Sequence, residues 1–221
     1  SETLEERPVN YLSEITSCFE SDNVSWINIY GLHDMELINS LGQLFKIPPL
    51  LLEDILNTDL KPKYEESDDY SVVILKMLSE DSNENVIIAE QFTLILGTNF
   101  VITLQERVGD VFAPVRDRIR KSKGRIRGKG NDYLAYTLLD TIADNYSQLV
   151  ENIGKKVEDL EDVIFLESDK NIASQIYQYK IELNFLRKSI RPVKELLDKI
   201  FKSDTSFFKT SSIKYIKSLS E

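Results

Sequence analysis

Cysteine, histidine and tryptophan are nearly missing from this 221-residue sequence, which contains one of each. The lone Cys18 excludes an internal disulfide and a cysteine-based zinc site, and it fits a reducing compartment. With His33 as the single histidine, no Ser-His-Asp or Cys-His-Asn arrangement is convincing. His33 stands next to a predicted helix cap, where a surface or capping role is the ordinary interpretation. We therefore expect that the chain is not an enzyme.

Long apolar runs are also absent. Residues 47–52 and 72–75 are among the longest, and a membrane-spanning helix needs about 18 apolar residues or more. No signal-peptide pattern is present, so we expect the chain taken alone to be soluble. The sequence begins Ser1-Glu2-Thr3 without a methionine, which indicates a piece excised from a longer protein.

Positive charge is scarce outside one segment. The formal net charge is −10 and the isoelectric point is about 4.8, which argues against a nucleic-acid partner because that binding depends on Lys and Arg. Residues 116–129 contain eight cations and one acid, Asp117. This segregation raises an anionic lipid surface or the acidic remainder of the chain as contacts, against the plainer alternative of a solvated helix face and loop. The cations are Arg116, Arg118, Arg120, Lys121, Lys123, Arg125, Arg127 and Lys129.

The N-terminal part mixes strand-like and helix-like patterns. Capping residues, prolines and β-branched runs predict the boundaries of five short elements. They are a strand over Thr3–Val9, a helix over residues 11–19 capped by Asn10, a strand over Val24–Tyr30, a helix capped by Asp34, and a helix over Leu50–Leu56 with Pro49 in its first turn.

Four further strands follow in succession. They are predicted over residues 62–66, 70–79, 86–96 and 100–105, with polar or glycine-containing connections. Two βα units followed by an antiparallel meander predict an α/β (α+β) fold, in which a mixed parallel/antiparallel sheet has helices on both faces. A helix predicted over Asp110–Arg120 completes this α/β domain, which we assign to residues 1–123 before a glycine-rich break at 124–130.

The last third of the chain predicts two long helices, over Asn131–Glu167 and Asp169–Lys202. Each repeats apolar residues at heptad spacing, and the short connection between them predicts antiparallel neighbours whose apolar seams face each other. We assign residues 131–203 to this helical pair and 204–221 to the start of a truncated stalk helix. Pro192 should kink the second helix or leave a backbone carbonyl unpaired.

Carboxylate oxygens are the plentiful ligand type. Acidic pairs such as Glu53-Asp54 and isolated acids such as Asp140 suit hard cations, which prefer carboxylate and water oxygens. Solvation is the ordinary alternative for any one of these acids. No loop has the alternating acids and central glycine of a calcium-binding hand, so composition alone leaves cation binding open.

Residues 45–56 form the most distinctive motif, Phe-Lys-Ile-Pro-Pro-Leu-Leu-Leu-Glu-Asp-Ile-Leu, and Lys61-Pro62-Lys63 follows it. With further segments in register at 90–96, 109–116 and 132–140, this order resembles the cytosolic domain of the CorA family of divalent-cation, chiefly magnesium, channels and transporters. The resemblance covers nearly the whole chain. Pro48 stands where the family usually has histidine, and Lys61 stands where it usually has arginine.

The resemblance implies a regulatory, divalent-cation-sensing domain of a homopentameric Mg²⁺ channel or transporter, with Co²⁺ or Ni²⁺ as further ions. Such a protein belongs to the inner (plasma) membrane, and this part of it would be cytoplasmic. The family's Gly-Met-Asn signature and its two membrane helices would lie beyond Glu221, so we expect this chain to lack the transmembrane pore.

Residue by residue, Asp54 matches the family's metal ligand that faces the neighbouring subunit, while Glu53 and Asp140 match a second acidic site. The partner carboxylate of Asp54 aligns with Ser218, a poor ligand, so we expect a weaker first site or one completed by water or Glu221. Two alternatives stay open. One is a zinc-type transporter domain of the same superfamily, and the other is a soluble helical protein-interaction module that uses the heptad seam.

Overall fold

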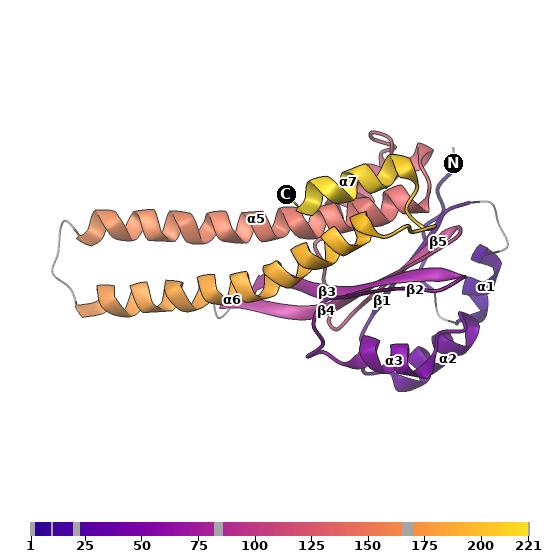
Figure 1. The fold of residues 1–221 in the computed structure, drawn as a ribbon, viewed down its shortest axis with the longest axis horizontal. Helices are drawn as coiled ribbons and strands as arrows, with labels where there is room; N and C mark the ends of the chain where they lie inside the picture. The colour runs from indigo at the N-terminus through magenta and orange to yellow at the C-terminus, as the bar shows by residue number, and fades with distance from the viewer. Residues whose placement is uncertain (1–2, 10, 20–22, 82–85, 165–169, 221) are drawn as a thin grey trace.

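A computed structural model describes residues 3–9, 11–19, 23–81, 86–164 and 170–220. Figure 1 shows a five-stranded sheet covered by helices on both faces, with two long helices that extend well beyond it. The elements in chain order are α1 (Ser13–Phe19), β1 (Ser25–Tyr30), α2 (Met35–Leu44), α3 (Pro49–Leu56), β2 (Lys63–Glu66), β3 (Tyr70–Asp81), β4 (Val86–Gly97), β5 (Phe100–Gln105), α4 (Ala113–Arg120), the 3₁₀ helix η1 (Ile126–Gly128), α5 (Asn131–Ile164), α6 (Lys170–Lys202) and α7 (Thr210–Ser220).

The strands lie in the order β1-β5-β4-β3-β2. Strands β2 to β5 form an antiparallel meander, and β1 pairs in parallel with β5, with Trp26 opposite Val101. The predicted mixed sheet is therefore confirmed, and each of the four meander strands lies within two residues of its predicted bounds.

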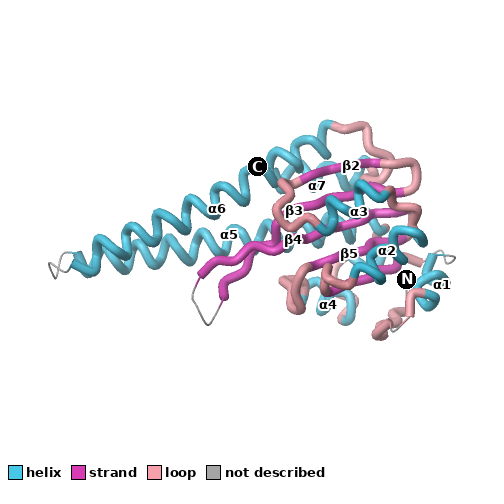
Figure 2. The backbone as a smooth tube through the Cα atoms, turned by 90° about the horizontal axis from the view of Figure 1, so that it is seen from below, coloured by secondary structure: helices cyan, strands magenta, loops and turns pink. Residues whose placement is uncertain are grey.

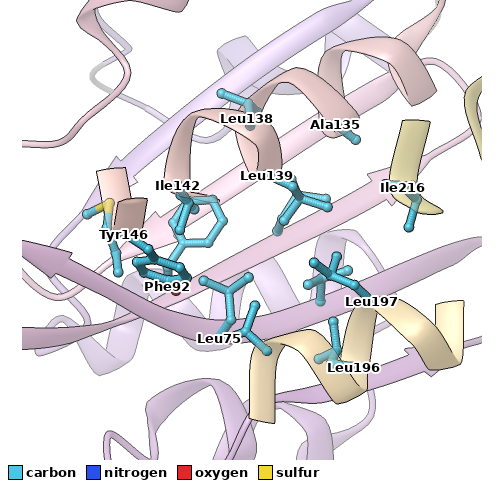
Figure 3. Packing of buried hydrophobic residues seen from close by; sticks show 14 of the residues in the cluster. Leu75, Phe92, Ala135, Leu138, Leu139, Ile142, Tyr146, Leu196, Leu197 and Ile216 are labelled. Atoms are coloured by element: carbon cyan, nitrogen blue, oxygen red, sulfur yellow. The ribbon is translucent and has the colours of Figure 1, made fainter. Parts of the chain in front are cut away.

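Alternation along the central strands divides the apolar residues between two cores, because successive side chains of a strand point to opposite faces. On β3, Val72 and Ile74 pack with α1, α2 and α3. Val73 and Leu75 belong to the other core, which α4, α5, α6 and α7 complete. Figure 3 shows part of this second core, where Leu75 and Phe92 of the sheet lie beside Ile142 and Tyr146 of α5.

Two predicted elements at the edges of the α/β part differ from the structure. Residues 3–9 form no strand, since all seven are exposed and the segment offers no apolar face to a sheet. The predicted cap Asn10 lies outside the described residues. Helix α4 begins at Ala113 rather than at Asp110, and the Asp110 carboxylate accepts a hydrogen bond from the Phe112 N–H in the turn just before the helix.

The long helices α5 and α6 run antiparallel and leave the sheet together (Figure 2). Two side chains of α5 tie its inner half to β3, with Tyr146 Oη donating to the Lys76 carbonyl and Asn145 Nδ2 donating to that of Leu78. Helix α6 continues through Pro192. Its apolar seam is buried or, at Ile190, partly buried from Leu186 inwards, but farther out Ile176 and Leu183 are 49% and 43% exposed, so the predicted contact between seams is incomplete there.

A buried carboxylate on β4 makes stability depend on pH. Burial, helped by the charges of Glu106 and Asp110, raises the pKa of Glu90 to about 6, although the N–H of Arg107 donates to it. Since the folded pKa exceeds the ordinary 4.5, this contribution to stability is present below pH about 4.5 and is lost as pH rises through about 6.

Glu90→Gln is therefore expected to raise the free energy of unfolding at pH 7 by about 2 kcal/mol and to leave it nearly unchanged at pH 4. Urea denaturation at both pH values measures the effect, and the exposed Glu36→Gln on α2 serves as the control. Equal stability of Glu90→Gln and the wild type at pH 7 would contradict the assignment.

Candidate metal-binding residues

Helix α3 holds Glu53 and Asp54 on its outer side, because Leu51 and Ile55, four residues apart, are buried in the core. A buried glutamine on β4 fixes the end of this helix. Gln91 Nε2 donates to the carbonyls of Asp54 and Ile55 at 2.9 and 3.1 Å, which satisfies two groups that a helix terminus leaves unpaired. The backbone that carries Asp54 is thus anchored to the sheet.

The Asp54 carboxylate already contacts a cation of the same chain. Lys63 Nζ lies 2.5 Å from Asp54 Oδ2 and 2.6 Å from Glu65 Oε1. The hydrogen bond with Asp54 contributes most to raising the pKa of Lys63, and the hydrogen bond with Glu65 raises it further. The Asp54 side chain is 18% exposed, whereas Glu53 is an exposed residue beside it.

Asp140 lies on α5 and accepts a hydrogen bond from Tyr136, which belongs to a cluster of three tyrosines. Burial and the charge of Asp144 raise its pKa, although the hydrogen bond from Tyr136 opposes the shift. The Tyr136 ring stacks on Tyr215 of α7 at a centroid distance of 5.0 Å, and Tyr133 packs edge-on against Tyr215 at 5.9 Å. Asp140 is therefore half-buried at the junction between α5 and α7.

The structure does not bring the three predicted ligands together within one chain. Helix α3 covers one face of the sheet and α5 covers the other (Figure 1). Among the described residues, no three or more His, Cys, Asp or Glu side chains gather into a group that could hold a metal ion. Carboxylate oxygens suit Mg²⁺, which keeps several of its waters, so each acidic position fits part of a coordination shell.

Three residues that contact the predicted ligands or the backbone that carries them were not predicted from the sequence. Lys63 was noted there only as part of a Lys-Pro-Lys segment, and neither Gln91 nor Tyr136 has a periodic or compositional signal. Their roles depend on contacts between strands and helices that are far apart along the chain. An alignment of related sequences in which these positions keep the same residues would be needed to identify them.

With this geometry described, a comparison with family models decides the family. The model described as CorA-like Mg²⁺ transporter protein matches residues 21–221. The chain belongs to the CorA family. That family consists of ion transporters and is not an enzyme class.

Relatives of this CorA-family chain include the cobalt/magnesium transport protein CorA of Thermotoga maritima, 38% identical over 198 residues, which are 90% of this chain and 56% of that protein. A putative metal ion transporter of Bacillus subtilis, YfjQ, is 26% identical over 179 residues, 81% of this chain and 54% of the relative. The chain thus spans little more than half the length of these relatives.

Solved structures share the fold. The soluble domain of CorA from Methanocaldococcus jannaschii superposes with a TM-score of 0.75 at 20% identity, over 90% of this chain and 82% of that one. The ZntB cytoplasmic domain from Vibrio parahaemolyticus gives 0.67 at 13% identity, over 88% and 78%. Within the described part of this CorA-family chain, no helix combines the length and apolarity needed to cross a bilayer.

The position that the CorA resemblance pairs with Asp54 offers no carboxylate. Ser218 lies exposed on α7, and its Oγ donates to the Lys214 carbonyl at 3.5 Å. No acidic residue occurs in α7 over Thr210–Ser220, and Glu221 lies outside the described residues.

Proposed function

We propose that this chain is the regulatory, divalent-cation-sensing domain of a CorA-type Mg²⁺ channel or transporter, placed on the cytoplasmic side of the inner (plasma) membrane. In this proposal Mg²⁺ binds between neighbouring copies, at Asp54 and at a second site shared by Glu53 and Asp140. Family membership and the names of the relatives support the transport role. The pore would come from a segment that the present sequence does not contain.

The observation that carries the proposal is the position of the acidic residues on opposite faces of one sheet. If α3 of one copy meets α5 of the next, the two surfaces in contact are different, and the interface is heterologous. Repetition of such a contact closes into a ring when the rotation allows it. A homopentamer, which the family resemblance implies, is one such ring.

Electrostatics explains how the ion would regulate such a ring. Each copy has a formal charge of −10, and carboxylates brought together across an interface repel each other. A bound Mg²⁺ would cancel this repulsion, and its loss would loosen the interface. Because Tyr136 contacts both Asp140 and Tyr215, Mg²⁺ binding at Asp140 would also affect the packing of α7.

Zinc is the less suitable ion for these positions. The ZntB domain shares the fold, but Zn²⁺ sites are built mainly from Cys and His, and this chain has only Cys18 and His33. Family membership likewise favours a transporter domain over a free helical interaction module. Uptake of Mg²⁺, Co²⁺ and Zn²⁺ by the full-length protein would separate the ions, and uptake of Zn²⁺ alone would favour the zinc alternative.

Magnesium is expected to stabilise the chain by about 2.7 kcal/mol at a hundred times its dissociation constant. The double variant Asp54→Ala/Asp140→Ala should lose this effect. Thermal unfolding measured in EDTA and in about 20 mM Mg²⁺, together with sedimentation to follow association, tests the proposal.

The matched control is Glu151→Ala/Asp159→Ala, which removes the same charge from exposed positions of α5. It should keep the Mg²⁺ response. A wild-type melting temperature that is the same in EDTA and in Mg²⁺ would count decisively against the proposed function.

A further inference from the structure

Lys63 contacts one of the two carboxylate oxygens of Asp54, the residue through which the proposed site would bind its metal ion. We infer that the Lys63 ammonium is a tethered counter-ion, which competes with the divalent cation for the Asp54 carboxylate and thereby sets the ion concentration at which this site responds. The inference rests on the proposed function of Asp54 and adds a means of regulating it.

The contact joins two elements whose backbones are held independently of each other. Lys63 begins β2, where it lies opposite Ile74 of β3 in the antiparallel register. Asp54 lies near the end of α3, which Gln91 anchors through two carbonyls. The Lys63 side chain reaches across to Asp54, so rotation of its flexible four-carbon stem can open or close the contact without main-chain movement.

The two cations compete for the same carboxylate. The Lys63 ammonium has only donors, and it lies 2.5 Å from Oδ2, one of the two oxygens with which the carboxylate could bind a metal ion directly or through its waters. A metal ion at the remaining oxygen, Oδ1, would be repelled by the nearby ammonium, and one that used both oxygens would have to displace it from Oδ2. The structure also shows where it would go, since Glu65 Oε1 already accepts from the same Nζ at 2.6 Å.

The exposure of this pair keeps the exchange reversible. The Lys63 side chain is 32% exposed and that of Asp54 is 18% exposed, so water can solvate both groups during the exchange. Ion pairs at such positions contribute little net stability, and a divalent ion at millimolar concentration can displace the lysine. Without the metal, Lys63 keeps Asp54 neutralised and oriented. The presence of the Lys63 ammonium therefore raises the metal concentration at which the Asp54 site becomes occupied.

The test removes the charge of Lys63 in one variant and that of the neighbouring Lys61 in another, and compares their Mg²⁺ dissociation constants. Lys63→Met is expected to lower the Mg²⁺ dissociation constant by about three- to fivefold, measured by isothermal titration calorimetry on the full chain. Lys61→Met is the matched control, because Lys61 is an exposed lysine two residues earlier that forms no ion pair within the described residues. It removes the same charge and should change the constant by less than about twofold.

Two more variants sharpen the result. Lys63→Arg keeps the charge and is able to contact a carboxylate through two nitrogens, so its Mg²⁺ affinity should not exceed that of the wild type. Lys63→Gln repeats the loss of charge with a polar side chain, in case methionine perturbs β2. In the metal-free wild type, ¹⁵N spectra should show the Lys63 ammonium held by Asp54 and Glu65, and Mg²⁺ should shift its signal as the contact with Asp54 is lost.

The outcomes separate this inference from the proposed function. If the wild type binds Mg²⁺ through Asp54 but Lys63→Met binds no more tightly, or no more tightly than Lys61→Met, the competition is refuted and the proposed function stands. If Lys63→Met binds Mg²⁺ in a range where the wild type does not, the competition is supported. If neither binds up to about 20 mM, both proposals fail.

Discussion

Replacing Asp110 by alanine is expected to lower the free energy of unfolding by about 3–5 kcal/mol, because it removes the buried end of an ion pair and leaves the partly buried Arg116 guanidinium without its partner. The Asp110 side chain is only 1% exposed and accepts from both terminal nitrogens of Arg116. Tyr30 Oη donates to it at 2.9 Å, Asn28 Nδ2 at 3.2 Å and the Phe112 N–H at 2.9 Å. This one carboxylate connects β1 to the start of α4.

The same contacts give Asp110 a pH dependence of definite sign. Burial by itself would raise its pKa, but the hydrogen bonds from Arg116, Phe112 and Tyr30 outweigh burial and hold the pKa below the ordinary 3.8. A depressed folded pKa gives stability that is present above pH about 3.8 and is lost as pH falls through the folded value. In the alanine variant this part of the acid sensitivity should be missing.

Urea denaturation at pH 7, repeated below pH about 4, measures both effects. The control is Asp117→Ala, which removes an exposed carboxylate from α4 and breaks only its surface pairs with Arg120 and Lys121. Surface changes of this kind cost less than about 0.5 kcal/mol. If Asp110→Ala and Asp117→Ala are equally stable, the network around Asp110 contributes nothing of the kind argued here.

Asp110 also shows where sequence reasoning reaches its limit. Its place before Pro114 correctly suggests a helix entry, yet nothing local indicates that Tyr30, 80 residues earlier, donates to it. Arg116 likewise belongs to a basic run that reads as a solvated surface. In the structure its guanidinium is paired with Asp110 and lies 5.2 Å from the Trp26 ring centroid.

Most elements of the fold could be predicted because their signals are local. Alternating apolar residues, turn residues and caps define β1 to β5 and α1 to α3, and Asp34 accepts from the Leu37 N–H as its sequence position suggests. The order of the strands was not predicted. The parallel pairing of β1 with β5 joins segments about 75 residues apart and depends on how the helices pack between them.

The candidate site divides in the same way. The family resemblance identifies Asp54, Glu53 and Asp140 as candidate metal ligands from short sequence motifs. Their metal-binding role stays a prediction. The sequence could not reveal that Lys63 contacts Asp54, or that α3 and α5 lie on opposite faces of the sheet. Both facts change the chemistry, since the first supplies a competing cation and the second requires a neighbouring copy.

The heptad pattern illustrates a prediction that was right about the helices and incomplete about their packing. A heptad repeat reports that one stripe of a helix is apolar, but it does not say what covers the stripe. Near the sheet, Val193 and Leu197 of α6 are buried in the core shared with α5. Farther out, Ile176 and Leu183 continue the same stripe and are largely exposed.

Phe92→Ala is the second change expected to be severe, with a loss of about 3–5 kcal/mol from the cavity that it leaves. Phe92 is fully buried on β4, and its ring centroid lies 5.4 Å from that of Phe112. On its other side it lies close to Ile142 and Tyr146 of α5 (Figure 3). The cavity would therefore open where the sheet meets the long helices.

Because this core is shared, the destabilisation should reach the sheet and the helical pair together. The only tryptophan, Trp26, reports on β1 by fluorescence, whereas far-UV circular dichroism reports mainly on α5 and α6. Both probes should give one coincident urea transition in the wild type, shifted equally in Phe92→Ala. The control Leu50→Ala, 69% exposed on α3, should leave that transition in place. Separate transitions for the two probes would instead show that the glycine-rich break at residues 124–130 divides two independently folding units. A single shifted transition would show that the sheet and the helical pair unfold as one cooperative unit, to which both α3 and α5 belong.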